Sequence, residues 1–122
     1  EDAKAGIFDE KKMRATDKYY IEKYFKKIDS ENYEINGSLK EIIRFYRSNL
    51  IYDRPAVKYD IIFCRNVMIY FDKDNQKKVI DMFYDSLNCG GHLFIGHSES
   101  LYFIENNFKY KKVADSPVYY KD

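Results

Sequence analysis

The stretch that most constrains the fold is YDIIFCRNVMIYFD, at residues 59–72. Its apolar run IIFC, at residues 61–64, is typical of a strand buried on both faces of a parallel sheet. The polar residues Arg65 and Asn66 come directly after this run. Ligands of open α/β sheets collect at the carboxyl ends of such strands. We therefore expect a central strand over residues 61–64 with a binding site at its end.

A helix and a second strand are predicted next. Asp72 can cap a helix over residues 73–87, and a turn with two glycines follows it. The apolar stripe of this helix consists of Val79, Ile80, Phe83 and Leu87. An apolar strand is expected over residues 92–96. The order strand, helix, strand predicts a βαβ unit, in which residues 61–64 pair in parallel with residues 93–96.

Two hairpins are predicted near the ends of this unit. The first covers residues 26–35, where strand-forming residues flank the turn sequence Ser-Glu-Asn. A helix over residues 18–25, capped by Thr16 or Asp17, should precede it. The second hairpin covers residues 108–121, around Asp-Ser-Pro.

Residues 37–48 are ambiguous. Leu39, Ile42, Ile43 and Tyr46 recur at helical spacing, but the sequence IIRFYR is rich in strand formers. We favour one helical turn at residues 39–41 and then a strand over residues 42–48.

Composition excludes several classes of function. At 122 residues the chain is one domain or part of one, and its net charge of +1 favours neither nucleic acid nor a membrane surface as a partner. No apolar segment is long enough for a membrane span. Cys64 and Cys89 have no neighbour at metal-ligand spacing, so we expect no metal site and two free thiols in a reducing cytoplasm. The chain does not begin with Met, which leads us to expect a fragment.

Three sequence stretches together resemble one family. CRNVMIYFD, NCGGHLFIGHSESL and RSNL are similar to segments of the CheR family of chemotaxis-receptor glutamate O-methyltransferases. The resemblance implies an α/β fold, a partial class I (Rossmann-like) methyltransferase sheet with a small inserted β-hairpin and a C-terminal antiparallel hairpin. Residues 1–122 would be the C-terminal portion of the catalytic domain, with residues 26–36 as the inserted hairpin subdomain.

The resemblance also implies a reaction and its participants. The enzyme would use S-adenosylmethionine to esterify glutamates on the cytoplasmic domain of methyl-accepting chemoreceptors, leaving S-adenosylhomocysteine. It would act in the cytoplasm, without nucleic acid and without membrane insertion. A glutamate carboxylate is already ionised at neutral pH, so the transfer needs no general base or metal. The protein would hold the reactants in line and exclude water.

The same resemblance assigns the site residues. Asn49 and Leu50 would contact the adenine, Arg65 and Asn66 the amino-acid end of the cofactor, and Tyr70 would be the catalytic residue beside the transferred methyl group. An arginine can bind a carboxylate through two hydrogen bonds, and an aromatic face suits a sulfonium cation. From the residues alone, Asn49 also fits an ordinary strand-to-loop junction, Arg65 a surface ion pair and Tyr70 the core.

The loop GHSES after the second strand offers one more candidate. His97 is not needed as a base by a carboxylate nucleophile. We expect it to order its loop together with Ser98 and Glu99.

Some family features are missing from these residues. No G-x-G cofactor loop occurs in the 122 residues, so we expect weak or no cofactor binding by this chain alone, and activity in the intact parent protein. The strand at residues 42–48 would lack a partner, which predicts either a homodimer or a displaced segment. The alternatives are a non-catalytic module that binds a receptor or another protein, and a class I methyltransferase that acts on a small molecule.

Overall fold

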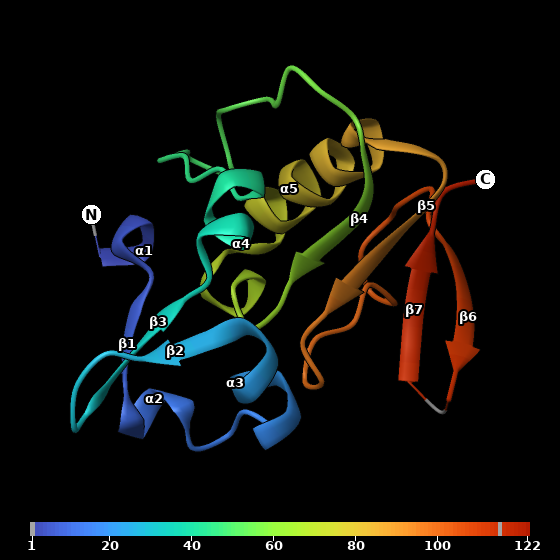
Figure 1. Ribbon diagram of the computed structural model, residues 1–122. Coiled ribbons are helices and arrows are strands. Elements are labelled where there is room, and N and C mark those ends of the chain that lie inside the picture. The colour runs from blue at the N-terminus through green and yellow to red at the C-terminus, as the bar shows by residue number, and fades with distance from the viewer. Residues whose placement is uncertain (1, 115) are drawn as a thin grey trace. The chain divides into compact units, whose positions relative to one another are not determined.

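The computed structural model describes residues 2–114 and 116–122, which form two compact units (Figure 1). The first unit extends to Arg47 and the second covers Ser48–Asp122. Each unit has its own β-sheet. Across the described residues, no helix has the length and apolar character required to cross a bilayer.

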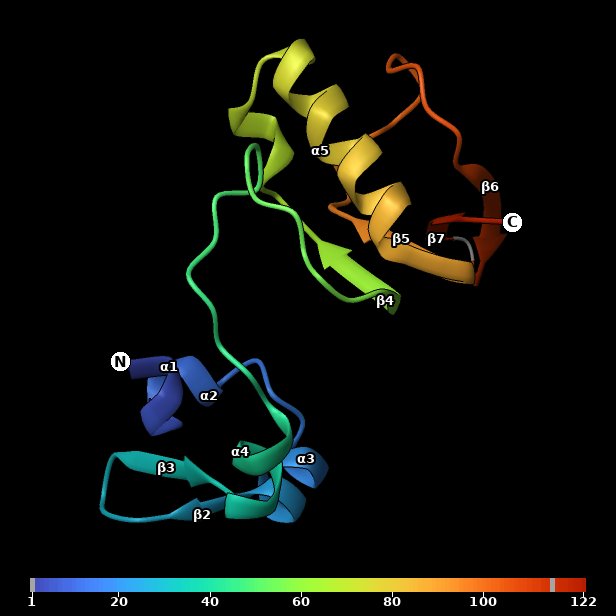
Figure 2. The ribbon, with the colours of Figure 1, turned by 90° about the horizontal axis from the view of Figure 1, so that it is seen from above.

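The first unit is a three-stranded antiparallel sheet with short helices. Its strands have the order β1-β3-β2, and β2 and β3 form the predicted hairpin, visible in Figure 2. Asp29 closes the turn, because its carboxylate accepts hydrogen bonds from the N–H groups of Glu31 and Asn32, both at 2.8 Å. The elements are α1 (Asp2–Ala5), β1 (Ile7–Asp9), α2 (Glu10–Met13), α3 (Lys18–Tyr24), β2 (Phe25–Lys27), β3 (Asn32–Ile35) and α4 (Gly37–Ile42).

Local signals in this unit were predicted well. Asp17 caps α3, with its carboxylate accepting from the N–H of Tyr19 at 2.8 Å. The pairing of β1 with β3 was not predicted, because β1 is only three residues long and its partner lies far along the chain.

The prediction of a strand over residues 42–48 is wrong. Ile42 is the last residue of α4, which contains the predicted helical turn, and residues 43–49 pair with no strand among the described residues. Strand-forming side chains do not make a strand without a partner for the backbone N–H and C=O groups. Tyr46 is 84% exposed. Among the described residues, the segment therefore lies outside any sheet, and its displacement or its pairing in a homodimer stays a prediction.

The second unit contains a four-stranded mixed sheet in the order β4-β5-β7-β6. As predicted, β4 and β5 are parallel, with Ile62 opposite Leu93 and Cys64 opposite Ile95. The predicted C-terminal hairpin is also confirmed, since β7 pairs with β6 in antiparallel orientation and joins β5 as well. The elements are β4 (Tyr59–Cys64), the 3-10 helix η1 (Met68–Tyr70), α5 (Lys73–Ser86), β5 (Leu87–Ile95), β6 (Lys109–Val113) and β7 (Ser116–Tyr120).

One expectation about β4 needs correction. It is an edge strand and not a central one, because only β5 pairs with it among the described residues. Ile61 is 53% exposed and Phe63 is 70% exposed, so the apolar run is not buried on both faces. An apolar run of this kind is buried only where a neighbouring strand and a covering layer are present. Phe63 instead stacks on Phe94 of β5, with ring centroids 4.9 Å apart.

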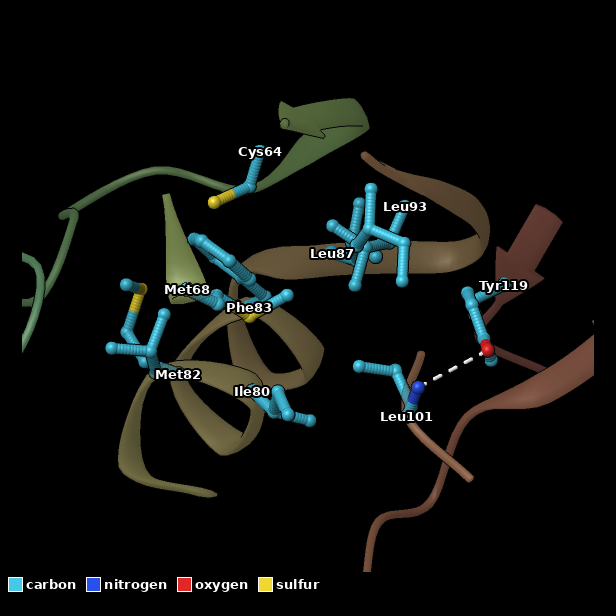
Figure 3. Close-up of a cluster of buried hydrophobic side chains, with 11 residues drawn as sticks. Cys64, Met68, Ile80, Met82, Phe83, Leu87, Leu93, Leu101 and Tyr119 are labelled. Carbon is cyan, nitrogen blue, oxygen red and sulfur yellow. Dashed lines mark hydrogen bonds between the residues drawn. The ribbon is translucent and has the colours of Figure 1, made fainter. Parts of the chain in front are cut away.

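The core of this unit lies between α5 and the sheet. Asp72 caps α5 through a hydrogen bond from the N–H of Asn75 to its carboxylate at 2.9 Å, as predicted. The predicted stripe of this helix is buried, and it packs with side chains from β4, β5 and β7 in Figure 3. The buried cluster consists of Cys64, Met68, Val79, Ile80, Met82, Phe83, Leu87, Leu93, Ile95, Leu101 and Tyr119. The helix ends one residue earlier than expected, because Leu87 already has extended backbone angles.

Candidate functional site

The ends of β4 and β5 are joined by one carboxylate. Glu99 Oε2 accepts hydrogen bonds from the N–H of Asn66 at 2.8 Å and from the N–H of Gly96 at 2.6 Å. Glu99 Oε1 accepts from the N–H of Met68 at 3.0 Å. Asn66 and Met68 follow β4, whereas Gly96 and Glu99 follow β5. One side chain therefore holds the two strand ends in a fixed arrangement, which we call the Glu99 bridge.

The backbone around this bridge is unusual in two ways. Asn66 has a φ of 58°, the left-handed region that few residues other than glycine adopt. Gly96 has no room for a side chain, since a Cβ atom there would lie 2.6 Å from Glu99 Oε2 and 2.9 Å from the backbone nitrogen of Asn66. The tight turn after β4 therefore depends on a glycine after β5.

The predicted cofactor residues Arg65 and Asn66 lie where the sequence placed them. They directly follow β4, and both side chains are exposed. Because Asn66 is held by the Glu99 bridge, the direction of the chain at this pair is set by β5 as well as by β4. A guanidinium at this position can bind an anionic ligand group, and a side-chain amide can donate a hydrogen bond to an acceptor on the ligand.

Tyr70 lies on η1, which follows the same turn. It is 81% exposed, so it does not belong to the core. Its helix is anchored through Met68, which is buried, and through Gln76 of α5, whose amide donates to the carbonyl oxygens of Met68 at 2.9 Å and Phe71 at 3.1 Å. The exposed tyrosine therefore stands on a well-anchored turn.

Asn49 and Leu50 lie at the start of the same unit, but not at the end of a strand. Asn49 Oδ1 accepts from the N–H of Ile51 at 3.0 Å, and the N–H of Asn49 donates to Asp53 at 2.6 Å. Leu50 packs against the buried cluster. The segment that follows β4 contains Arg65, Asn66 and Tyr70. Convergence of Asn49 with these three residues on one concave surface stays a prediction.

The expected ordering role for the GHSES loop belongs to Glu99. His97 and Ser98 are exposed, and the bonds to the strand ends described above come from the glutamate. A hollow of about 330 Å³ next to the bridge is lined by Met68, Ile69, Gln76, Ser98, Glu99, Ser100, Phe103 and Ile104. Arg65 and Tyr70 do not line it, so it is not the predicted cofactor site.

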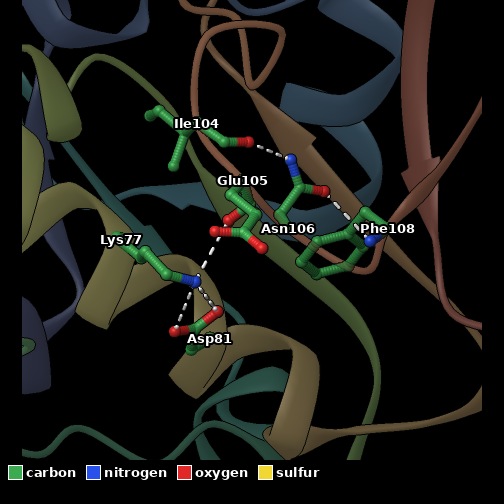
Figure 4. Close-up of polar contacts among 6 residues, drawn as sticks. All are labelled: Lys77, Asp81, Ile104, Glu105, Asn106 and Phe108. Carbon is green, nitrogen blue, oxygen red and sulfur yellow. Dashed lines mark hydrogen bonds and ion pairs between the residues drawn. The ribbon is translucent and has the colours of Figure 1, made fainter.

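The loop that follows Glu99 is fastened to α5 and to itself, as Figure 4 shows. Lys77 of α5 donates to the carbonyl oxygen of Glu105 at 3.2 Å and pairs with Asp81 at 3.1 Å. Asn106 donates to the carbonyl oxygen of Ile104 at 2.7 Å and accepts from the N–H of Phe108 at 3.0 Å. These contacts hold the loop in addition to the hydrogen bonds of Glu99.

The two cysteines are free thiols, as predicted. Burial raises the pKa of Cys64 to about 11, with a smaller contribution from the negative charge of Glu99. Cys89 is exposed. Within residues 2–114 and 116–122, no group of three or more His, Cys, Asp or Glu side chains is arranged to hold a metal ion.

Comparison with known proteins identifies the family. The model of the family described as "CheR methyltransferase, SAM binding domain" matches residues 1–117. The chain belongs to the CheR methyltransferase family. The family resemblance drawn from the three sequence stretches is therefore confirmed. The α/β fold, with a mixed sheet and antiparallel hairpins, agrees with that of an S-adenosylmethionine-dependent methyltransferase. S-adenosylmethionine is the cofactor named, as SAM, in the family description.

Several curated relatives are chemotaxis proteins by name. "Chemotaxis protein methyltransferase 2" of Vibrio cholerae is 35% identical over 122 residues, covering 98% of this chain and 42% of the relative. "Probable chemotaxis protein methyltransferase" of Rhizobium etli is 36% identical, over 80% of this chain and 38% of the relative. "Chemotaxis protein methyltransferase" of Borreliella burgdorferi is 34% identical, over 82% of this chain and 36% of the relative. The chain thus spans about two fifths of the length of these relatives.

Proposed function

We propose that this chain contributes the Arg65–Asn66 and Tyr70 side of the active site in an enzyme that methylates glutamate side chains of chemoreceptors. The observation that carries the proposal is the fixed turn after β4, in a chain that belongs to the CheR family. The names of its relatives support a role in chemotaxis.

The residues present fit S-adenosylmethionine in chemical type. Arg65 offers a guanidinium to the carboxylate of the cofactor, and Asn66 offers an amide beside it. Leu50 offers an apolar surface to the adenine ring, and the Asn49 side chain offers N–H donors to a ring nitrogen. Tyr70 offers an exposed aromatic ring, which attracts a sulfonium cation.

The chemistry assigned to these residues is mainly positional. S-adenosylmethionine, when bound, supplies a methyl group on a positively charged sulfur. A receptor glutamate has a reference pKa of about 4.3, so its carboxylate is ready to attack at neutral pH and no residue has to remove a proton. Arg65 and Asn66 would orient the cofactor, and Tyr70 would hold the sulfonium end and exclude water from it.

The partner proposed for this reaction is the cytoplasmic domain of a methyl-accepting chemoreceptor, which places the enzyme in the cytoplasm. Residues 26–36, which contain most of the β2–β3 hairpin, are proposed as an inserted subdomain that contacts the receptor. Its strands form a separate sheet, in a unit distinct from the proposed catalytic residues, which supports a binding role for it.

Cofactor binding by variants of the complete gene product tests the assignment of the site. We expect Arg65→Ala to raise the Kd for S-adenosylmethionine about 10- to 100-fold in calorimetry, since a hydrogen bond to a charged group is worth about 1.5–3 kcal/mol. The matched control is Arg54→Ala, which removes an exposed arginine from the loop before β4. Equal Kd values for the wild type and Arg65→Ala would remove Arg65 from the site.

Turnover tests the role of Tyr70. We expect Tyr70→Ala to reduce kcat/KM for S-adenosylmethionine about 2- to 30-fold, through loss of a cation–π contribution of about 0.5–2 kcal/mol to the sulfonium, with the melting temperature unchanged because the ring is exposed. Tyr102→Ala is the matched control, since Tyr102 is also an exposed tyrosine of this unit. An unchanged kcat/KM in Tyr70→Ala would exclude the role proposed for this residue.

A further inference from the structure

We propose that Glu99 is a positioning residue, whose carboxylate fixes the Arg65–Asn66 turn in the conformation that binds the cofactor. The proposal deepens the proposed function and rests on it. We assign Glu99 no contact with the cofactor or with the receptor glutamate. It acts through the backbone N–H groups that its two oxygens bind.

The geometry shows how completely the carboxylate is used. Oε2 accepts from the N–H groups of Asn66 and Gly96, and Oε1 accepts from the N–H of Met68, all within 2.6–3.0 Å. An ionised carboxylate accepts at both oxygens and donates at neither, so it suits a site where every neighbour is an N–H donor. Hydrogen bonds of this charge-assisted kind are stronger than those between neutral groups.

The turn needs such support because of its conformation. Asn66 is held at a φ of 58°, in the left-handed region that glycine adopts readily and asparagine occasionally, as single residues. The bond from its N–H to Glu99 opposes relaxation to a negative φ. If Asn66 relaxed, the side chains of Arg65 and Asn66 would change direction relative to β4. Loss of the bridge should therefore impair cofactor binding before it impairs folding of the core.

A glutamine cannot replace this carboxylate. Its amide has the same shape but only one oxygen, and its NH2 group would face an N–H donor. Glu99→Gln therefore removes at least one of the three bonds without creating a cavity. Glu105→Gln is the matched control, because Glu105 lies on the same loop and takes part in its structure through its carbonyl oxygen.

The test measures cofactor binding, turnover and folding in the complete gene product. In Glu99→Gln we expect the Kd for S-adenosylmethionine to rise about tenfold or more, the size expected for one lost hydrogen bond to a charged group. The KM for the receptor substrate should stay within about twofold, and Glu105→Gln should match the wild type in every measurement. A Kd for Glu99→Gln equal to that of the wild type would overturn the proposal, as would a parallel rise in the receptor KM.

NMR spectroscopy supplies a readout that a general loss of stability would not produce. In the wild type, the amide proton signals of Asn66, Met68 and Gly96 should lie at the downfield positions of protons bonded to a carboxylate, because all three N–H groups donate to Glu99. In Glu99→Gln at least one of the three signals should move upfield, while the amide signal of Leu93 in the core stays in place. Unchanged positions of all three signals in Glu99→Gln would contradict the bridge.

Gly96→Ala provides a second route if Glu99→Gln fails to fold. The added Cβ would collide with Glu99 Oε2 and Asn66, so we expect the same tenfold or larger loss of cofactor affinity. Gly37→Ala is the matched control, since a Cβ there meets nothing within 4 Å. Normal affinity in Gly96→Ala would count against the proposal. If the wild type binds no S-adenosylmethionine, the proposed function fails. If the wild type binds it and both variants bind it with the same affinity, only the proposal for Glu99 fails.

Discussion

Replacing Leu93 by alanine tests the core on which the site stands. Leu93 is fully buried in β5, the strand that joins the parallel and antiparallel parts of the sheet. It lies opposite Ile62 of β4 and opposite Tyr119 of β7. Truncation of its side chain therefore leaves a cavity where both pairings meet α5.

The cost can be worked out from this environment. The change removes about three methylene equivalents, worth about 0.8 kcal/mol each when buried, or roughly 2.4 kcal/mol in all. The cavity left behind raises the expected loss to about 3–5 kcal/mol. Small domains are stable by about 5–15 kcal/mol, so this single change should remove a large part of the stability of the second unit.

Urea unfolding followed through the amide NMR signals of β5 measures this loss in the Ser48–Asp122 unit alone. Leu93→Met should cost less than about 1.5 kcal/mol, because it nearly conserves volume. Val57→Ala, at an exposed loop position, should stay within about 0.5 kcal/mol of the wild type. A loss below about 1 kcal/mol for Leu93→Ala would show that β5 is not the centre of a packed core.

Four further predictions follow from the same structure. The Cys64 thiol should react with a disulfide reagent far more slowly than Cys89 at pH 8, since it is buried with its pKa raised from 9.0 to about 11; equal rates would contradict this. Because the folded form holds that proton more tightly, Cys64 should contribute stability that is complete below about pH 9 and is lost as the pH rises toward 11, measurable as a fall in melting temperature that is smaller in Cys64→Ala. Asp72→Ala should destabilise α5 by about 1 kcal/mol in urea unfolding, through loss of the cap on Asn75, while Asp74→Ala serves as the control in the first turn. Calorimetry of the 122-residue chain with S-adenosylmethionine should detect no micromolar binding, because no G-x-G loop occurs in these residues; tight binding would show that such a loop is dispensable.

The parts of the fold that depend on nearby residues could be predicted from the sequence. Helix α5 carries its own signals, a capping aspartate and apolar residues at helical spacing, and it forms where expected. The β2–β3 hairpin likewise contains its own turn, closed by Asp29. The parallel pairing of β4 with β5 followed from the helix between them, because a crossover of this length favours neighbouring parallel strands.

Features that depend on distant partners could not be predicted. The burial of β4 is decided by the strand on its other side, and none of the described residues supplies one. The strand formers of residues 43–48 lack a partner for the same reason and remain irregular. The sequence indicated that the GHSES loop is ordered, but the role of Glu99 depends on two strand ends that lie about 30 residues apart in the chain. Gly96 was the one signal for this contact, since a glycine directly after an apolar strand indicates a close approach of backbones.

Methyl transfer to a receptor tests the central claim most directly. The complete gene product would be incubated with S-adenosylmethionine labelled in its methyl group and with the cytoplasmic domain of a chemoreceptor from the same organism. We predict labelled receptor whose label is released as methanol by mild base, the behaviour of a glutamate methyl ester, and loss of labelling when the modified glutamates are replaced by alanine. Cofactor binding without transfer to the receptor would instead indicate another acceptor, such as a small molecule. Absence of both cofactor binding and methyl transfer would contradict the proposed methyltransferase function. It would instead favour the alternative of a non-catalytic module that binds a receptor or another protein.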